Sequence, residues 1–168
     1  PFDDEGTLAQ ATYLVKNGIL AGRLHSVATA AALGEEPTGN ARAISFEYEP
    51  IVRMTTTFIL PGSKSKEELL GEVKEGILVE KVNHGTGHST FTLMPTLAYR
   101  IKNGRIAGPV SISALTGDLF TTLAEIDGLS DRLELYHAFF SGCGKWEQAP
   151  LPVAFGGPYV RVRNLLVY

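Results

Sequence analysis

Apolar and polar positions alternate with a period of two in several stretches of the chain, which is the pattern of β-strands. These stretches are also rich in β-branched and aromatic residues. The segment Val160-Arg161-Val162-Arg163 alternates without interruption, which predicts a strand with one face toward solvent. The predicted strands cover residues 52–59, 77–82, 90–101, 110–115 and 159–167.

Helical stretches are fewer, and about three short helices are expected. An Ala-rich segment covers residues 26–33 and precedes Gly34, which can end a helix with positive φ. A second helix is predicted to begin at Ser65, because Glu68 completes a capping box, and to stop at Gly76. A third covers residues 119–126. The apolar positions expected to face inward are Leu69, Leu70 and Val73 in the second helix and Leu119, Phe120, Leu123 and Ile126 in the third.

Two Asn-Gly pairs, Asn17-Gly18 and Asn103-Gly104, follow short apolar runs and predict hairpins with type I′ turns. The segments around them resemble each other, since six of ten positions match between residues 13–22 and 99–108. Either both hairpins use the same turn chemistry, or an internal duplication has produced two similar half-domains. The elements together predict an α+β fold dominated by antiparallel sheet, with no linker long enough to divide residues 1–168 into two independent domains.

Composition and net charge disfavour several classes of function. The chain has 168 residues, of which 44% are hydrophobic and 20% charged, as in ordinary globular domains. Its net charge of -3 and lack of basic runs disfavour nucleic-acid binding, which depends on neutralising phosphates. No apolar run has the length of a membrane span. A single cysteine, Cys143, indicates a reducing, cytoplasmic setting.

Glycines cluster in segments that we interpret as loops, among them residues 83–88 and 141–145. The second segment places Cys143 between Gly142 and Gly144, where the thiol is either exposed for chemistry or a buried small hydrophobe. A phosphate-binding P-loop is excluded, because Trp146 follows Lys145 where a Ser or Thr is required.

Four histidines are present, at positions 25, 84, 88 and 137, and none is followed by glutamate. A helical His-Glu metalloprotease motif is therefore absent from the sequence. His84 and His88 are four residues apart, but Gly85 and Gly87 argue against a helix between them. A zinc site made of His84, His88 and Cys143 within this chain is a minor alternative. The acidic start, residues 3–5, is either a site or a solvated turn.

Several motifs occur in an order that resembles the TldD/PmbA family of zinc metallopeptidases over nearly the whole chain. They are Asp3-Asp4-Glu5-Gly6-Thr7, Pro37-Thr38-Gly39-Asn40-Ala41-Arg42, Glu49-Pro50 with Val52-Arg53-Met54-Thr55, Pro61-Gly62 before the capped helix, Ile101-Lys102-Asn103-Gly104, and Cys143-Gly144-Lys145 with Gln148. Trp146-Glu147 and the segment 83–88 depart from the family pattern, which puts substrate selection in doubt but not the role of the cysteine.

The resemblance implies a cytoplasmic peptidase that cleaves small or unstructured peptides and works as a homodimer or as a heterodimer with a related subunit. One zinc ion is expected, bound by Cys143 and by a His-Glu-x-x-x-His motif upstream of this chain. No catalytic residue is then expected within the chain, which alone should hydrolyse nothing. His84, Gly142, Gly144 and Lys145 are candidate substrate-binding residues.

Two further hypotheses concern the function of the chain and the way it binds substrate. The alternative to a peptidase domain is a non-catalytic partner subunit or scaffold, in a family that includes proteins labelled modulators of DNA gyrase. For substrate binding, we expect an extended peptide to add to a sheet edge near residues 90–94 or near Gly142.

Overall fold

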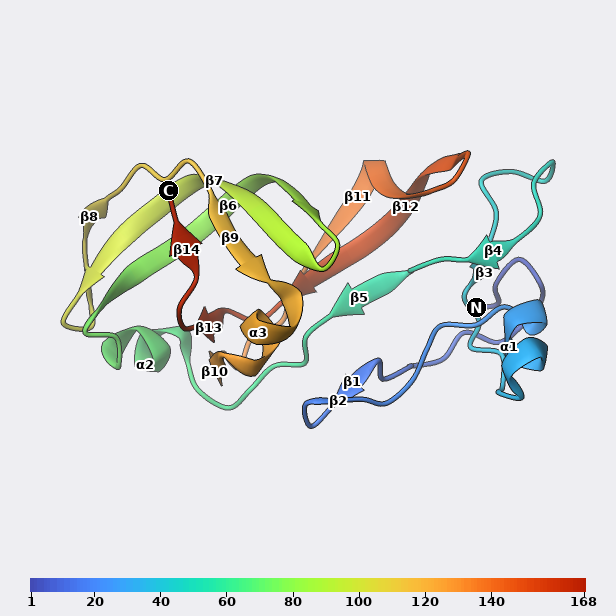
Figure 1. Cartoon of the computed structure of the whole chain (residues 1–168), viewed down its shortest axis with the longest axis horizontal. Helices are drawn as coiled ribbons and strands as arrows, with labels where there is room; N and C mark the ends of the chain where they lie inside the picture. The colour runs from blue at the N-terminus through green and yellow to red at the C-terminus, as the bar shows by residue number, and fades with distance from the viewer. The chain divides into compact units, whose positions relative to one another are not determined.

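The computed structural model describes the backbone of residues 1–168 and all side chains except those of residues 139–141. The chain divides into two compact units (Figure 1). Unit 1 contains residues 1–58 and 135–156, and unit 2 contains residues 59–134 and 157–168. Both units are discontinuous in sequence, so no single linker separates them. Each carries one of the two Asn-Gly hairpins; the similarity of two half-domains stays a prediction.

Unit 1 is built from short elements and one long hairpin. Its elements are β1 (Val15–Lys16), β2 (Ile19–Leu20), α1 (Val27–Leu33), β3 (Ala41–Arg42), β4 (Ile51–Val52), β5 (Thr56–Phe58), β11 (Glu134–Lys145) and β12 (Gln148–Gly157). Strands β11, β12 and β5 form a sheet in that order, so β11 and β5 are its outer strands. β5 runs parallel to β12, with Thr56 opposite Ala154.

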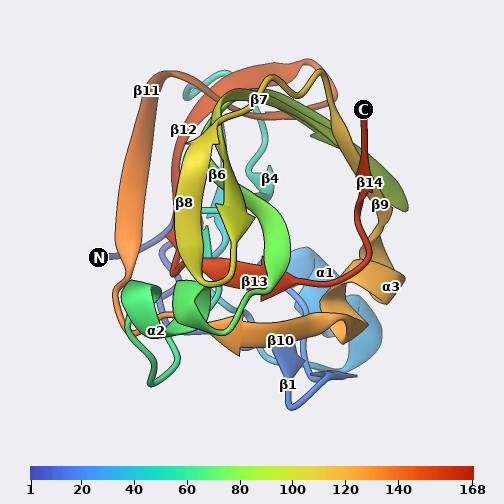
Figure 2. The ribbon, with the colours of Figure 1, turned by 90° about the vertical axis from the view of Figure 1, so that its left-hand side faces the viewer.

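Unit 2 contains a five-stranded antiparallel sheet. Its elements are α2 (Lys66–Gly71), β6 (Glu75–Gly87), β7 (Thr90–Lys102), β8 (Arg105–Pro109), β9 (Leu115–Asp118), α3 (Leu119–Ala124), β10 (Ile126–Leu129), β13 (Val160–Val162) and β14 (Leu166–Val167). The sheet order is β14-β9-β7-β6, with β8 also paired to β7. β10 and β13 form a separate antiparallel pair, which Figure 2 shows side by side. Ala98, Ile112 and Leu115 form a small core.

The predicted α+β fold with three short helices and mostly antiparallel sheet is confirmed. Ser26 caps α1, and Gly34 ends it with a φ of 65°. Ser65 and Glu68 form the predicted capping box of α2. Both Asn-Gly turns have the two positive φ values of a type I′ turn, 53° and 75° at residues 17–18 and 47° and 74° at residues 103–104.

Several boundaries differ from the predictions. α2 ends at Gly71, five residues before Gly76. α3 ends at Ala124, and its apolar side chains do not point inward, since Phe120 is 75% exposed. The predicted strand 52–59 is interrupted between β4 and β5, and residues 110–114 form no strand. The segment 159–167 forms two short strands, and Val160 is not buried as alternation predicted.

Both segments interpreted as glycine loops are strands instead. Residues 83–87 belong to β6, and residues 142–145 belong to β11. The glycines make room for the neighbouring strand. A Cβ at Gly85 would lie 2.8 Å from the side chain of Leu93 on β7, and a Cβ at Gly142 would overlap the Leu151 carbonyl on β12.

Candidate functional site

Cys143 lies on β11, an outer strand of the unit 1 sheet, and is half-buried. Its neighbours Gly142 and Gly144 are exposed. The hairpin turn follows at Trp146, which has a φ of 54° and is 74% exposed. The thiol therefore stands on a regular strand close to a tight turn, with no large side chain at the adjoining positions.

The side chain of Arg53 holds the backbone of β11 at Cys143. Its side chain is 1% exposed, and its Nη2 donates a hydrogen bond to the carbonyl oxygen of Cys143. Its backbone is held in turn by Asn40, because Arg53 N donates to Asn40 O at 2.8 Å and Asn40 Nδ2 donates to Arg53 O at 3.3 Å. Arg53 therefore connects the loop around Asn40 to the strand that carries the thiol.

The other nitrogen donors of the Arg53 guanidinium lack hydrogen-bond partners among the described residues. Nε and Nη1 are buried and have no hydrogen-bond partner among the described residues. A buried guanidinium normally has all its donors paired, so this side chain carries a positive charge in a poorly compensated place. One sequence feature points to this residue, because Arg53 is a charge between the apolar residues Val52 and Met54.

Lys145 reaches the same segment of backbone. Its Nζ donates to the carbonyl of Val52 at 3.0 Å and lies 5.0 Å from the ring centroid of Trp146. The predicted substrate-binding residues Gly142, Gly144 and Lys145 thus flank Cys143, and the contacts in the structure give Gly142 and Lys145 a role in holding the hairpin.

Arg42 is the second arginine beside the site. Its Nη1 donates to Met54 O at 2.8 Å and its Nη2 to Pro152 O at 2.9 Å. Burial lowers the pKa of the Arg42 guanidinium, and the positive charge of Arg53 adds to this effect, whereas Asp4 and Cys143 act in the opposite direction. Arg42 therefore lies within the electrostatic reach of both Arg53 and Cys143.

The acidic start of the chain forms a structural turn rather than a site. Asp3 accepts hydrogen bonds from the backbone of Thr7 at 2.8 Å and of Ala41 at 2.9 Å. Asp4 accepts one from Ala43 N, and Glu5 accepts one from the first amide of α1 at 2.7 Å. The three carboxylates thus tie the N-terminus to β3 and α1, which in turn places Asn40 and Arg53.

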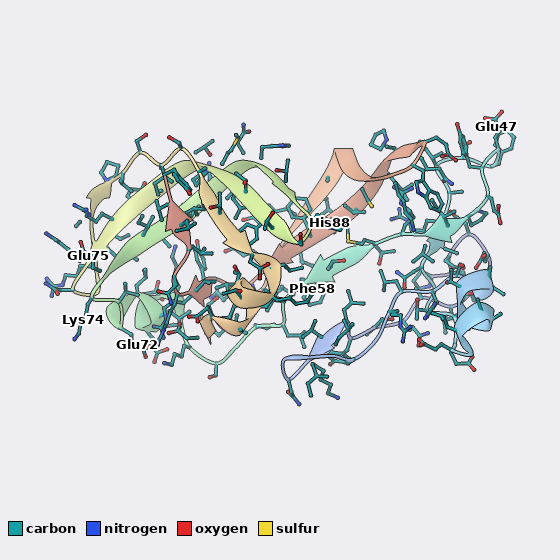
Figure 3. All side chains as sticks on the ribbon, in the orientation of Figure 1. Glu47, Phe58, Glu72, Lys74, Glu75 and His88 are labelled. Atoms are coloured by element: carbon teal, nitrogen blue, oxygen red, sulfur yellow. The ribbon has the colours of Figure 1, made fainter. Side chains whose placement is uncertain are left out.

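Gln148 is a buried polar residue just after the turn. It is 2% exposed, accepts from Ile44 N at 3.0 Å and donates to Glu49 O at 2.9 Å. These bonds hold the loop between β3 and β4 at the hairpin, and Glu47 marks the outer end of that loop in Figure 3. The family motif Cys-Gly-Lys with Gln148 is therefore one structural module.

A groove of about 310 Å³ lies on the sheet of unit 1. It is lined by Arg42, Thr55, Thr56, His137, Ala138, Pro152, Val153 and Ala154. The groove combines a guanidinium and an imidazole with an otherwise apolar and hydroxyl lining.

Of the four histidines, only His137 lies on the strand that carries Cys143. His84 and His88 belong to the β6–β7 hairpin of unit 2, where both are exposed, and His88 stands at its tip (Figure 3). His25 is 3% exposed and bridges Thr29, at 3.1 Å, and Glu35, at 2.8 Å. Among the residues with described side chains, no three His, Cys, Asp or Glu side chains are close enough to hold a metal ion.

The predicted sheet edge at residues 90–94 is wrong. Residues 90–93 pair with β9 on one side of β7, and residues 91–94 pair with β6 on the other. β6, which carries His84, is an outer strand of that sheet, and β11 is the outer strand of the unit 1 sheet near the thiol.

No helix among the described residues is long and apolar enough to cross a membrane.

Sequence comparison gives consistent matches. The profile of the PmbA/TldA metallopeptidase C-terminal domain matches residues 1–168. A metalloprotease of Synechocystis sp. is 44% identical over 167 residues, which are 99% of this chain and 36% of that protein. A zinc metalloprotease TldD homolog of Saccharolobus solfataricus is 33% identical over 168 residues, which are 99% of this chain and 37% of that protein.

Solved structures share the fold. TldE from Thermococcus kodakarensis superposes with a TM-score of 0.77 at 20% identity, covering 99% of this chain and 35% of that one. A Thermotoga maritima protein with the provisional name modulator of a DNA gyrase gives 0.76 at 29% identity, covering 100% of this chain and 35% of that one. The chain therefore spans about a third of the length of the relatives it matches.

Proposed function

Because the chain belongs to the PmbA/TldD metallopeptidase family, whose C-terminal domain profile covers residues 1–168, we propose that it supplies Cys143 as one ligand to a catalytic zinc ion. The observation that carries this proposal is the position of the only thiol, which is half-buried on an outer strand. The buried guanidinium of Arg53 donates a hydrogen bond to the backbone carbonyl of the same cysteine. A structural cysteine packed as a small hydrophobe would need neither feature.

The described residues fit a zinc ion as a partial ligand set. A thiolate is a preferred zinc ligand, and the Arg53 guanidinium holds the backbone carbonyl of the same residue. The remaining ligands would come from histidines upstream of this chain, because no group of three ligating side chains occurs among those described. When bound, the zinc would polarise the scissile carbonyl and activate a water molecule.

The chain's own residues would position the peptide substrate. An extended peptide pairs with the free edge of a strand through main-chain hydrogen bonds, which demand little of its sequence. β11 offers such an edge next to Cys143, and β6 offers another that carries His84. Gly142 and Gly144 leave the first edge uncovered by side chains. Small or unstructured polypeptides are therefore the proposed substrates.

The assembly and location are part of the same proposal. The intact protein would act in the cytoplasm as a homodimer or as a heterodimer with a related subunit, and unit surfaces of this domain would contribute dimer contacts and part of the substrate chamber. The large exposed apolar side chains, among them Phe46 at 98% and Phe120 at 75%, support such contacts.

A second candidate function is that of a non-catalytic partner subunit or scaffold. The provisional name of the Thermotoga maritima relative, modulator of a DNA gyrase, favours a regulatory role for that protein. A partner of this kind would need the architecture of both units but not the thiol. Removal of the thiol therefore separates the two functions.

The test uses the intact protein that contains this chain and compares Cys143→Ser with wild type. We expect the wild type to retain about one zinc ion per chain, and its cobalt-substituted form to show a thiolate-to-cobalt charge-transfer band in the near ultraviolet. Cys143→Ser should lose the band, most of the zinc and the hydrolysis of an unstructured peptide.

Trp146→Phe is the matched control, because it lies on the same hairpin and keeps an aromatic ring beside Lys145. It should retain zinc and the cobalt band. A Cys143→Ser protein that binds zinc and cleaves peptide as well as wild type would refute the role of the thiol. Absence of zinc and of peptidase activity from the folded wild type would instead favour the partner subunit.

A further inference from the structure

The strongest unexplained feature of the chain is the buried guanidinium of Arg53. The side chain is 1% exposed, and its hydrogen bond to the described residues joins Nη2 to the carbonyl oxygen of Cys143. Nε and Nη1 lack a partner among the described residues. A buried cation with unsatisfied donors destabilises a fold, and an apolar residue of similar shape would fill the same space at lower cost.

Two further cations, Arg42 and Lys145, lie near Arg53. The charge of Arg53 lowers the pKa of the Arg42 guanidinium, and the Nζ of Lys145 donates to the carbonyl of the preceding residue, Val52. Asp4 and Cys143 raise the pKa of Arg42, against its burial and the charge of Arg53.

The backbone contacts show what the side chain of Arg53 is attached to. Its N–H and carbonyl are both bonded to Asn40, whose side chain also accepts from Thr38 at 2.8 Å. Asn40 and Thr38 are 6% and 9% exposed. The arginine therefore extends from a rigid, buried loop to the residue that carries the thiol, and it determines where that point of the outer strand lies.

From this arrangement we infer that Arg53 is the positioning residue of the metal site: from a buried loop, its guanidinium holds the backbone of Cys143 in place. Removal of a residue that contacts a metal ligand and orients it commonly weakens metal binding by about 10–100-fold. The inference rests on the proposed role of Cys143 as a zinc ligand.

The experiment uses the intact protein, with Arg53→Met and Arg53→Lys as test variants. Zinc affinity is measured by competition with a chelator, and the sulfur–metal bond is followed by the cobalt charge-transfer band. We expect zinc binding to weaken by about 100-fold in Arg53→Met and about 10-fold in Arg53→Lys, with the band shifted or reduced in both. Lysine keeps the charge but lacks the planar fork of donors.

Arg42→Met is the matched control, because it removes a neighbouring positive charge without touching the carbonyl of Cys143. Its zinc affinity should stay within about threefold of wild type. If removal of either arginine has the same effect, the role is general electrostatics, and the positioning inference fails. It also fails if both Arg53 variants fold and keep wild-type affinity and band, or if both lose native circular dichroism.

Cys143→Ser, measured in parallel, separates this inference from the proposal on which it rests. If Cys143→Ser loses zinc while the Arg53 variants keep it, the thiol is a ligand and Arg53 does not position it. If Cys143→Ser keeps zinc and the wild type shows no thiolate band, the ligand proposal itself is wrong, and the inference falls with it.

Discussion

Replacing a glycine next to Cys143 by alanine adds one methyl group and tests how closely β11 must approach β12 there. Gly142 and Gly144 flank Cys143, yet their surroundings differ. A Cβ at Gly142 would overlap the carbonyl oxygen of Leu151 and lie 2.7 Å from its carbonyl carbon, whereas one at Gly144 would lie 3.3 Å from the Cβ of Ala149. Gly142→Ala and Gly144→Ala therefore form a matched pair on one strand.

The size of the effect follows from the required displacement. Two carbon atoms pack at about 3.5 Å, so the contact with the carbonyl carbon alone requires the strands to separate by at least roughly 0.8 Å at Gly142, and the closer carbonyl oxygen requires more. A shift of at least this size stretches a hydrogen bond of about 2.9 Å to about 3.7 Å or more, beyond bonding distance. The loss of one or two such bonds destabilises the hairpin by about 2 kcal/mol, which is close to the usual cost of overpacking.

Hydrogen exchange of the intact protein measures this local cost. A change of about 2 kcal/mol should raise the exchange of β11 and β12 amides by roughly 30-fold in Gly142→Ala. Gly144→Ala should change it by less than about threefold, because the Cβ of Ala149 can give way by a few tenths of an ångström. Equal effects of the two substitutions, or none at Gly142, would refute the close-approach argument.

Two further predictions concern unit 2. Tyr159→Phe removes a hydroxyl that accepts from Lys66 at 2.9 Å and donates to Glu80 at 2.8 Å, so it should lower the free energy of unfolding by about 1 kcal/mol in urea titrations, and an unchanged midpoint would contradict this. The Arg161 hydrogen bond lowers the pKa of Asp127, against the effect of burial and with further help from Arg163. A carboxyl group whose pKa is lowered on folding stabilises the folded state at pH values above its unfolded pKa of about 3.9. This stabilisation is lost as the pH falls through the folded pKa. Asp127→Asn should therefore destabilise β10 and β13 at pH 7 but differ little from wild type near pH 2, and a pH-independent difference in their amide protection factors would refute the linkage.

Features fixed by near neighbours in sequence were predictable. The Asn-Gly turns, the Ser65–Glu68 capping box and the Gly34 helix end depend on residues within one turn of each other, and all three are present. The end of α2 at Gly71 was missed because the carbonyls of Val73 and Lys74 accept hydrogen bonds from the distant amides of Gly104 and Asn103 instead of from a continuing helix. Local signals show where an element can begin, while the packing of unit 2 decides where it ends.

The glycine-rich segments show why the site itself was less predictable. A glycine in a loop and a glycine under a neighbouring strand give the same sequence signal, and only the pairing partner tells them apart. Gly85 faces Leu93, eight residues away, and Gly142 faces Leu151, nine residues away. The segments 83–88 and 141–145 were therefore assigned to loops, although the strands β6 and β11 run through them.

The family motifs acquire a common explanation from their contacts. The acidic start binds β3 and α1, and the loop around Asn40 holds Arg53. Arg53 then reaches Cys143, about ninety residues further along the chain. These short motifs are thus joined by one series of hydrogen bonds that ends at the backbone carbonyl of Cys143. If this series serves to place a metal ligand, a change at its far end should alter the sulfur–metal bond. Asp3→Asn, which weakens the bond to Ala41, should therefore alter the cobalt band more than Glu47→Gln, which changes an exposed carboxylate outside the series.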